Sequence, residues 1–297
     1  MGSIRYIERK SGSLIKEFVP SEGMLRWLYN SSLGKATLHT LVKRKMLTML
    51  GGWYMSSRFS KKKIDKFITQ YQIDLSNYKI TDSKAYLNFN DFFFRKIQAE
   101  KRPIGNGIVS PADGKMLAFQ SITDVSSFFV KGSEFTIESF LKNKNLANKY
   151  ADGSMIIARL APTDYHRFHF PASGHISESK DIKGRYFSVS PMALKKSLEI
   201  FCQNYRTYST LKTDDFGDIL ISEVGATMVG SIIQTYQYNS QVEKGEEKGY
   251  FAFGGSTLVL FFEKGKVKLA ADLIENTCKG YETSVFVGEN IASKLTD

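Results

Sequence analysis

The sequence predicts an α+β fold, in which a helical N-terminal region precedes a β-rich body. Apolar residues recur at roughly helical spacing over residues 21–70. After residue 106, apolar runs rich in aromatic and β-branched residues dominate, as is typical of strands. The turn-rich segment 102–107 (RPIGNG) lies between these two parts. We therefore place a domain boundary there, with one region at residues 1–105 and the other at 106–297.

In the N-terminal region we expect helices over residues 21–70, broken near Gly51-Gly52. Residues 61–70 (KKKIDKFITQ) have the pattern of a short amphipathic helix. A further helix is expected to start within residues 88–94 (NFNDFFF), with Asn90 or Asp91 as its N-terminal cap.

In the body the expected elements are mainly strands. The chain has 297 residues, of which 42% are hydrophobic, enough for one large core or two modest ones. The expected strands cover residues 155–160, 219–224, 226–233 and 251–262. Helices are expected at 136–142 and 192–199.

The positive charge is concentrated at the N-terminus. The chain has a net charge of +11, and residues 1–70 hold 14 of the 41 basic residues but 4 of the 30 acidic ones. Basic residues interleave with apolar ones over residues 21–58, and Trp27, Trp53 and Tyr54 could act as interfacial anchors. Such a helix can lie in a membrane interface, or it can pack on the body with its basic face in water. Nucleic-acid binding is not expected, because no helix-turn-helix, zinc-finger or RNP pattern is present.

The cysteine count and the pattern of apolar residues bear on the cellular compartment of the protein. Two cysteines are too few for a disulfide framework, which fits a reducing compartment. Residues 1–16 lack the apolar core of a secretory signal. No run of 18 apolar residues is present, so no membrane-spanning helix is expected.

The tetrapeptide Gly254-Gly255-Ser256-Thr257 interrupts an apolar, strand-like run. Glycine lacks a Cβ, so the backbone there can adopt unusual dihedral angles and other groups can approach closely. A serine directly after such a point can reach the carbonyl group that precedes it. Taken alone, the pattern is more typical of a β-bulge with a hydroxyl residue at the strand edge.

Two further segments carry groups suited to catalysis. His166 and His169 lie with His175 in a loop that follows a strand, and loops on rigid sheets often host catalytic groups. We predict no metal site, because neither HExxH nor CxxC occurs. Asp113 lies in the turn Ser110-Pro111-Ala112-Asp113-Gly114, where a carboxylate also commonly caps its own turn.

Together these segments supply an aspartate, a histidine pair and a serine. A carboxylate can orient an imidazole, which can then take the proton of a serine hydroxyl. The serine could attack an external ester or amide, or the chain's own Gly255 carbonyl. No Gly-x-Ser-x-Gly elbow surrounds Ser256, which argues mildly against an ordinary hydrolase.

In combination these motifs resemble the phosphatidylserine decarboxylases, which are pyruvoyl-dependent enzymes made as self-cleaving proenzymes. The matching elements span nearly the whole chain. They are residues 54–63, 88–103, 110–114, 164–169, 224–226 and the Gly-Ser-Thr at 255–257. This chain has Gly254 where many members have leucine, a departure that leaves the reacting pair intact.

The resemblance implies roles for individual residues. His169 would deprotonate Ser256, with Asp113 orienting the imidazole, and Ser256 would attack the Gly255 carbonyl. The resulting ester would eliminate, and Ser256 would become a pyruvoyl cofactor. That group would be the electron sink for the carbanion left by loss of CO₂. His166 would protonate the product, although the two histidines could exchange roles.

The resemblance also implies products, partners and location. Cleavage between Gly255 and Ser256 would give a β chain (1–255) and an α chain (256–297), which would stay together as a heterodimer, with further dimerisation left open. As a carboxy-lyase, the enzyme would act on phosphatidylserine in an anionic membrane, as a peripheral protein on the cytoplasmic side of the cell membrane. Intact mass would distinguish this hypothesis from two others, a serine hydrolase and a non-enzymatic carrier module of the barrel-sandwich type.

Overall fold

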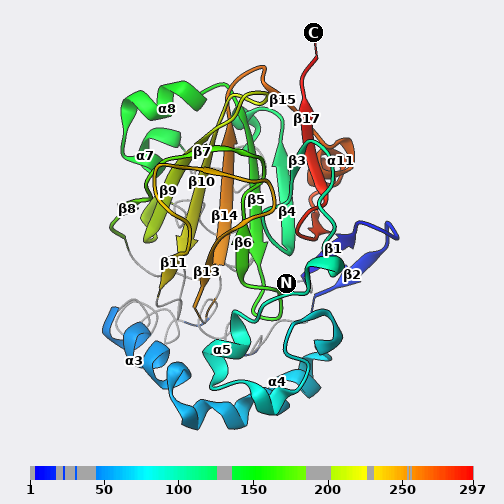
Figure 1. Ribbon diagram of the computed structural model, residues 1–297. Coiled ribbons are helices and arrows are strands. Elements are labelled where there is room, and N and C mark those ends of the chain that lie inside the picture. Colours follow the sequence, from blue (N-terminus) through cyan, green and yellow to red (C-terminus); the bar gives the residue numbers. More distant parts are fainter. Residues whose placement is uncertain are drawn as a thin grey trace.

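The computed structural model describes residues 4–17, 23, 31, 45–125, 136–184, 202–225, 231–252, 254 and 256–296. Within them the fold is mixed α+β, as predicted, and an 11-stranded sheet dominates it (Figure 1). Its path runs β12-β7-β9-β10-β14-β5-β4-β16-β1-β2, and β8 pairs with β9. The bounds of these strands are β1 (Arg5–Glu8), β2 (Leu14–Lys16), β4 (Gly114–Phe119), β5 (Ser154–Leu160), β7 (Gly174–Ile176), β8 (Lys180–Ile182), β9 (Arg206–Lys212), β10 (Asp218–Gly225), β12 (Ser240–Val242), β14 (Ser256–Phe262) and β16 (Glu282–Val285).

Two three-stranded sheets and several helices complete the described part. One small sheet has the order β11-β13-β6 and the other β15-β17-β3. Their strands are β3 (Ile108–Val109), β6 (Arg167–His169), β11 (Ile232–Gln234), β13 (Glu247–Phe251), β15 (Val267–Leu269) and β17 (Asn290–Lys294). The α-helices are α3 (Lys45–Ser56), α4 (Ile64–Tyr71), α5 (Phe89–Phe93), α7 (Ile137–Leu141), α8 (Lys144–Tyr150) and α11 (Ala271–Cys278). The 3₁₀ turns are η2 (Arg58–Lys63), η3 (Leu75–Asn77), η4 (Ser83–Ala85), η5 (Ala99–Lys101) and η6 (Ile122–Asp124).

Strand β14 lies in the middle of the main sheet, between the antiparallel strands β10 and β5. All its residues are buried, which explains why its sequence is apolar almost throughout. Ser256 begins the strand opposite Gly225 of β10 and Leu160 of β5. The expected strand at 251–262 is therefore two strands, β13 and β14, and Gly254 between them has φ +142°, a conformation that favours glycine.

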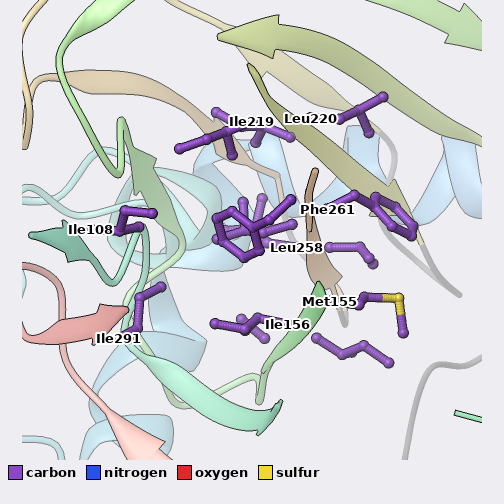
Figure 2. Close-up of a cluster of buried hydrophobic side chains, with 14 of the residues drawn as sticks. Ile108, Met155, Ile156, Ile219, Leu220, Leu258, Phe261 and Ile291 are labelled. Atoms are coloured by element: carbon purple, nitrogen blue, oxygen red, sulfur yellow. The ribbon is translucent and has the colours of Figure 1, made fainter. Parts of the chain in front are cut away.

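The core covers both faces of the main sheet (Figure 2). Met155 and Phe261 are register partners and share a face, where Phe261 packs on Phe140 of α7 at 5.4 Å between ring centroids. Leu258 points to the opposite face, because side chains alternate along a strand. There Figure 2 shows it in the same cluster as Ile108 and Ile291, which come from β3 and β17.

The N-terminal helices have a small core of their own. Figure 1 shows α3, α4 and α5 together at one end of the sheet body. Their shared buried residues are Met55, Ile64, Tyr86, Phe89, Phe92 and Phe93. The amphipathic segment 61–70 forms the end of η2 and most of α4, as predicted.

Two local expectations in this region are wrong. Helix α3 continues through Gly51-Gly52, where a break was expected. Helix α5 is capped by Asn88 rather than by Asn90 or Asp91, since the Asn88 side chain accepts a hydrogen bond from the Asp91 amide. Asn88 is extended and lies just outside the helix, which is the geometry that an N-cap requires.

The first residues differ from the expected helical region. Residues 5–16 form β1 and β2, and β1 joins the main sheet parallel to β16. Both strands are short and mostly exposed, so their pattern carried little signal. Among the other expectations, residues 192–199, 226–230 and 21–44 (apart from Gly23 and Ser31) lie outside the described residues.

The expected strands at 155–160 and 219–224 and the helix at 136–142 are confirmed as β5, β10 and α7. No helix within the described ranges has the length and apolar content needed to cross a membrane.

Candidate active site

Ser256 is the centre of the candidate site. It is fully buried at the start of β14, and its Oγ lies 3.3 Å from Nδ1 of His166. Gly255, the residue on the other side of the expected cut, lies outside the described residues. The structure thus brings the predicted serine together with one of the two predicted histidines.

The contacts of His166 define which nitrogen carries its proton. Its Nε2 lies 3.0 Å from the carbonyl oxygen of Ala161, which can only accept a hydrogen bond. Nε2 is therefore protonated in the neutral ring, and Nδ1 presents its lone pair to the Ser256 hydroxyl. Phe93 of α5 stacks on the imidazole at 3.9 Å between centroids and so fixes the plane of the ring. This is the arrangement of a base facing a nucleophile.

Burial keeps the His166 ring neutral. Its pKa is lowered from the ordinary value of 6.5 to about 3, first by desolvation and then by the positive charges of Arg95 and Lys115. The hydrogen bond to Ala161 opposes this shift only in part. His166 is therefore an imidazole that accepts a hydrogen bond at any pH near neutrality but is a weak base.

His169 lies in β6 and has different partners. Its Nδ1 lies 3.0 Å from the Gly245 carbonyl, so Nδ1 donates and Nε2 accepts from the Tyr165 hydroxyl at 3.0 Å. Burial lowers the pKa of His169, while the charges of Glu247 and Asp113 raise it. No contact between His169 and Ser256 is present among the described residues.

Asp113 is held by Arg102 rather than by a histidine. The guanidinium contacts both carboxylate oxygens, with Nη2 2.6 Å from Oδ2, and the Val287 amide donates to Oδ1 at 2.8 Å. The expected orientation of His169 by Asp113 is thus not present as a hydrogen bond, and the two interact through charge alone. Nor does Asp113 cap its own turn, which the Ser110 hydroxyl holds through the backbone of Ala112.

A cavity of about 740 Å³ opens beside Asp113 and Tyr165. The sheet body contributes Asp113, Lys115 and Tyr165 to its wall, and the N-terminal region contributes Ile73 and Tyr78. The cavity brings solvent-accessible space to the edge of the site, although Ser256 itself is enclosed.

Several residues at the site were not found from the sequence. Phe93, Tyr165 and Arg102 touch His166, His169 and Asp113 respectively, and each lies within a segment already singled out for another reason. The roles of Phe93 and Arg102 depend on contacts between different segments, and that of Tyr165 depends on the geometry of the turn before β6, so no sequence pattern identified them. His175 is exposed on β7. No group of three or more potential metal ligands occurs in the part of the chain that the structure describes.

Comparison with known proteins places this site in a family. A family model described as phosphatidylserine decarboxylase matches residues 89–293. A phosphatidylserine decarboxylase proenzyme of Fusobacterium nucleatum is 53% identical over 294 residues, covering 98% of each chain. A proenzyme of the same name from Desulfitobacterium hafniense is 45% identical over 291 residues, covering 97% of each chain. Another from Clostridium botulinum is 45% identical over 296 residues, covering 98% of this chain and 99% of the relative. The chain therefore belongs to the phosphatidylserine decarboxylase family.

Proposed function

We propose that this chain decarboxylates phosphatidylserine to phosphatidylethanolamine, using a pyruvoyl group that it makes from its own Ser256. Family membership supports the reaction. One observation carries the pyruvoyl step: the Ser256 hydroxyl is sealed from solvent and faces the unprotonated nitrogen of His166. A serine without solvent access is poorly placed to attack an external ester, which disfavours the hydrolase alternative.

In maturation, Ser256 Oγ attacks the carbonyl carbon of Gly255 while an imidazole takes the hydroxyl proton. The peptide C–N bond breaks as the amine of residue 256 takes a proton, and an ester joins the two parts. Elimination frees the Gly255 carboxylate and leaves dehydroalanine, which rearranges and reacts with water to release ammonia. The pyruvoyl group that results supplies the electron sink for loss of CO₂.

The two histidines divide these tasks in the proposal. His166 stays beside residue 256 after the cut, so it is placed to hold or deliver a proton there during decarboxylation. For the cleavage step, the contact with Ser256 favours His166 as the base. The surrounding charges favour His169: burial lowers the pKa of both histidines, but Glu247 and Asp113 oppose this shift at His169 more than Arg167 adds to it, whereas Arg95 and Lys115 add to it at His166. We retain His169 as the base of cleavage, with Asp113 as its charge partner; this requires His169 Nε2 to exchange the Tyr165 hydroxyl for Ser256.

The two products of the cut are proposed to remain one molecule. The α chain (256–297) would supply β14 between β10 and β5, and β16 between β4 and β1. It would also supply β17 between β15 and β3. Main-chain pairing on both sides of β14 and β16, and on the β3 side of β17, holds the α chain against the β chain (1–255), so the working unit is a heterodimer.

We further propose that the N-terminal region attaches the enzyme to an anionic membrane, on the cytoplasmic side of the cell membrane. Three large apolar side chains of this region are strongly exposed: Trp53 at 75%, Phe59 at 77% and Leu87 at 66%. The exposed Lys61, Lys62 and Lys63 follow Phe59 after one residue. Apolar side chains beside a basic cluster match the interface of an anionic bilayer. In this proposal residues 1–105 supply the docking surface and residues 106–297 supply the reacting side chains.

Intact mass spectrometry tests the proposal. The purified wild-type chain should give two species that meet between residues 255 and 256, the second lacking a free amine at its N-terminus. Ser256→Ala should remain one full-length chain without decarboxylase activity. A wild-type chain that decarboxylates phosphatidylserine while it stays intact would overturn the pyruvoyl proposal, although not the reaction.

A further inference from the structure

The side chain of Arg95 is a buried cation without a carboxylate partner in the described part of the chain. It is 2% exposed, and its Nε has no hydrogen-bond partner. Its other nitrogens contact the Tyr78 hydroxyl at 3.0 Å and the carbonyl groups of Phe92, Thr163 and Asp164 at 3.3, 3.2 and 3.5 Å. A buried charge that lacks an ionic partner is unfavourable for folding, so its presence calls for an explanation.

These contacts place Arg95 against the loop that carries His166. Thr163 and Asp164 lie between β5 and β6, directly before Tyr165 and His166. Arg95 also follows α5 by two residues, and α5 supplies Phe93, which stacks on the His166 ring. The short segment 93–95 of the N-terminal region therefore contacts both the backbone of the loop and the ring of His166.

The charge of Arg95 also reaches His166. The groups around that imidazole are Phe93 and Arg95 from the α5 segment, Lys115 from β4, the Ala161 carbonyl and Ser256. Among them the positive charges of Arg95 and Lys115 oppose protonation, and that of Arg95 is the stronger. The Lys115 ammonium is paired with Asp164 at 2.6 Å. Among the described residues Arg95 instead faces neutral oxygen atoms and the rings of Tyr78 and Phe92, at 4.3 and 4.8 Å from their centroids, and no carboxylate.

We propose that Arg95 is a positioning residue, which fixes the loop that carries His166 and supplies the positive charge beside that imidazole. The ring then keeps its lone pair directed at residue 256. The effect on catalysis rests on the proposed function, but the effects on the loop and on the charge of His166 do not. An experiment can therefore refute the role of Arg95 without refuting the proposed function, and the reverse.

Arg206 provides a matched control. It is also a buried guanidinium that donates to backbone carbonyl groups, those of Phe140, Cys202, Asn204 and Ser139, and it lies over the Phe140 ring. Its charge is not among those that shift the pKa of His166. Arg206→Met should therefore cause similar structural damage without changing the charge beside the site.

The first readout is the protonation of His166, followed by NMR of histidine-labelled Ser256→Ala chain so that cleavage cannot interfere. The His166 signal is assigned by its loss in His166→Gln. At pH 4.5 we expect a neutral ring in the parent, in Arg95→Lys and in Arg206→Met. In Arg95→Met the pKa should rise by about 1 to 2 units, so that roughly a quarter to three quarters of the ring is protonated at this pH. A folded Arg95→Met chain whose His166 stays neutral at pH 4.5 would refute the role of the charge.

The second readout is the rate of decarboxylation per processed molecule, in chains that retain Ser256. Loss of the Arg95 hydrogen bonds to the loop should lower this rate by about tenfold or more in Arg95→Met. Arg95→Lys should restore part of the rate. Arg206→Met should match wild type per folded molecule. Equal behaviour of Arg95→Met and Arg206→Met in both readouts would reduce Arg95 to a structural residue. If the His166 pKa changes but the decarboxylation rate does not, the result would count against the proposed catalytic role of His166 and not against the effect of Arg95 on its charge.

Discussion

Nδ1 of His166 and Oγ of Ser256 face each other at 3.3 Å, with the histidine proton held on the opposite nitrogen by the Ala161 carbonyl. The relationship joins the loop after β5 to the first residue of β14. It does not depend on the peptide bond before Ser256, so it can persist after that bond is cut. The same imidazole is thus available to the residue at position 256 before and after maturation.

The first prediction concerns His166. His166→Ala should lower the decarboxylation rate of processed molecules by about 10²- to 10⁴-fold, because a positioned proton-transfer group is lost at residue 256. The rate of CO₂ release is measured per α chain, so that any defect in cleavage is removed from the comparison. His175→Ala, which removes an exposed histidine, is the control and should retain full activity. Normal turnover by processed His166→Ala would exclude a direct role.

His169 is tested by cleavage rather than by turnover. His169→Ala should accumulate as uncleaved chain, because it removes the proposed base, whose protonated form the charges of Glu247 and Asp113 favour against the effect of burial. The fraction cleaved is followed by gel electrophoresis over time after synthesis. Cleavage at the wild-type rate would assign the base to His166, which already touches Ser256.

The burial of His166 predicts a dependence of stability on pH. Its pKa is about 3 in the folded chain and near 6.5 when unfolded, so only the unfolded state takes up the proton between these values. The stabilisation is complete above pH 6.5 and is lost as the pH falls toward 3, by up to about 1.4 kcal/mol per pH unit. The melting temperature of Ser256→Ala should fall on acidification. With His166→Gln added the fall should be shallower, and identical slopes would contradict the assigned pKa.

For the buried ion pair of Lys248 and Glu223, we expect the effects of the two residues on the free energy of unfolding to be strongly coupled. Both side chains are fully buried, 2.6 Å apart, and Glu223 also accepts from Thr207 and Gln234. Lys248→Met should lower the free energy of unfolding by about 3–5 kcal/mol, because it leaves a carboxylate buried without its cation. Adding Glu223→Gln should recover part of that loss. Urea unfolding of the Ser256→Ala chain measures both, and simple additivity of the two changes would show that the pair is not coupled.

Membrane docking predicts that Trp53 and Phe59 contribute to binding. Replacing either by serine should weaken sedimentation with vesicles that contain anionic lipid, by roughly tenfold, since each would lose the burial of a large apolar side chain. Tyr238→Ser is the control, because Tyr238 is 49% exposed but lies outside the N-terminal region. Unchanged sedimentation of the Trp53 and Phe59 variants would exclude this surface as the docking site.

The sequence predicted the long, buried strands and the residues of the site better than it predicted their contacts. Strands such as β5 and β10 are almost wholly buried and have mainly apolar centres, and this signal is local. Strand β1 has only 4 residues and is defined by pairing with β16 near the other end of the chain, so its own residues could not reveal it. The partnership of Asp113 with Arg102 was missed for a related reason, since no sequence pattern links the linker to the turn at residues 110–114.

The central position of β14 has a consequence for the life of the molecule. In the uncut chain, inserting β14 between β10 and β5 is an intramolecular step. Once Gly255 and Ser256 are separated, the same insertion becomes an encounter between two molecules and depends on their concentration. Folding must therefore come before the cut, and a mature enzyme that unfolds cannot return by the route it first took. We expect the uncut Ser256→Ala chain to refold at a rate independent of dilution, whereas recovery of the processed enzyme should decline as it is diluted.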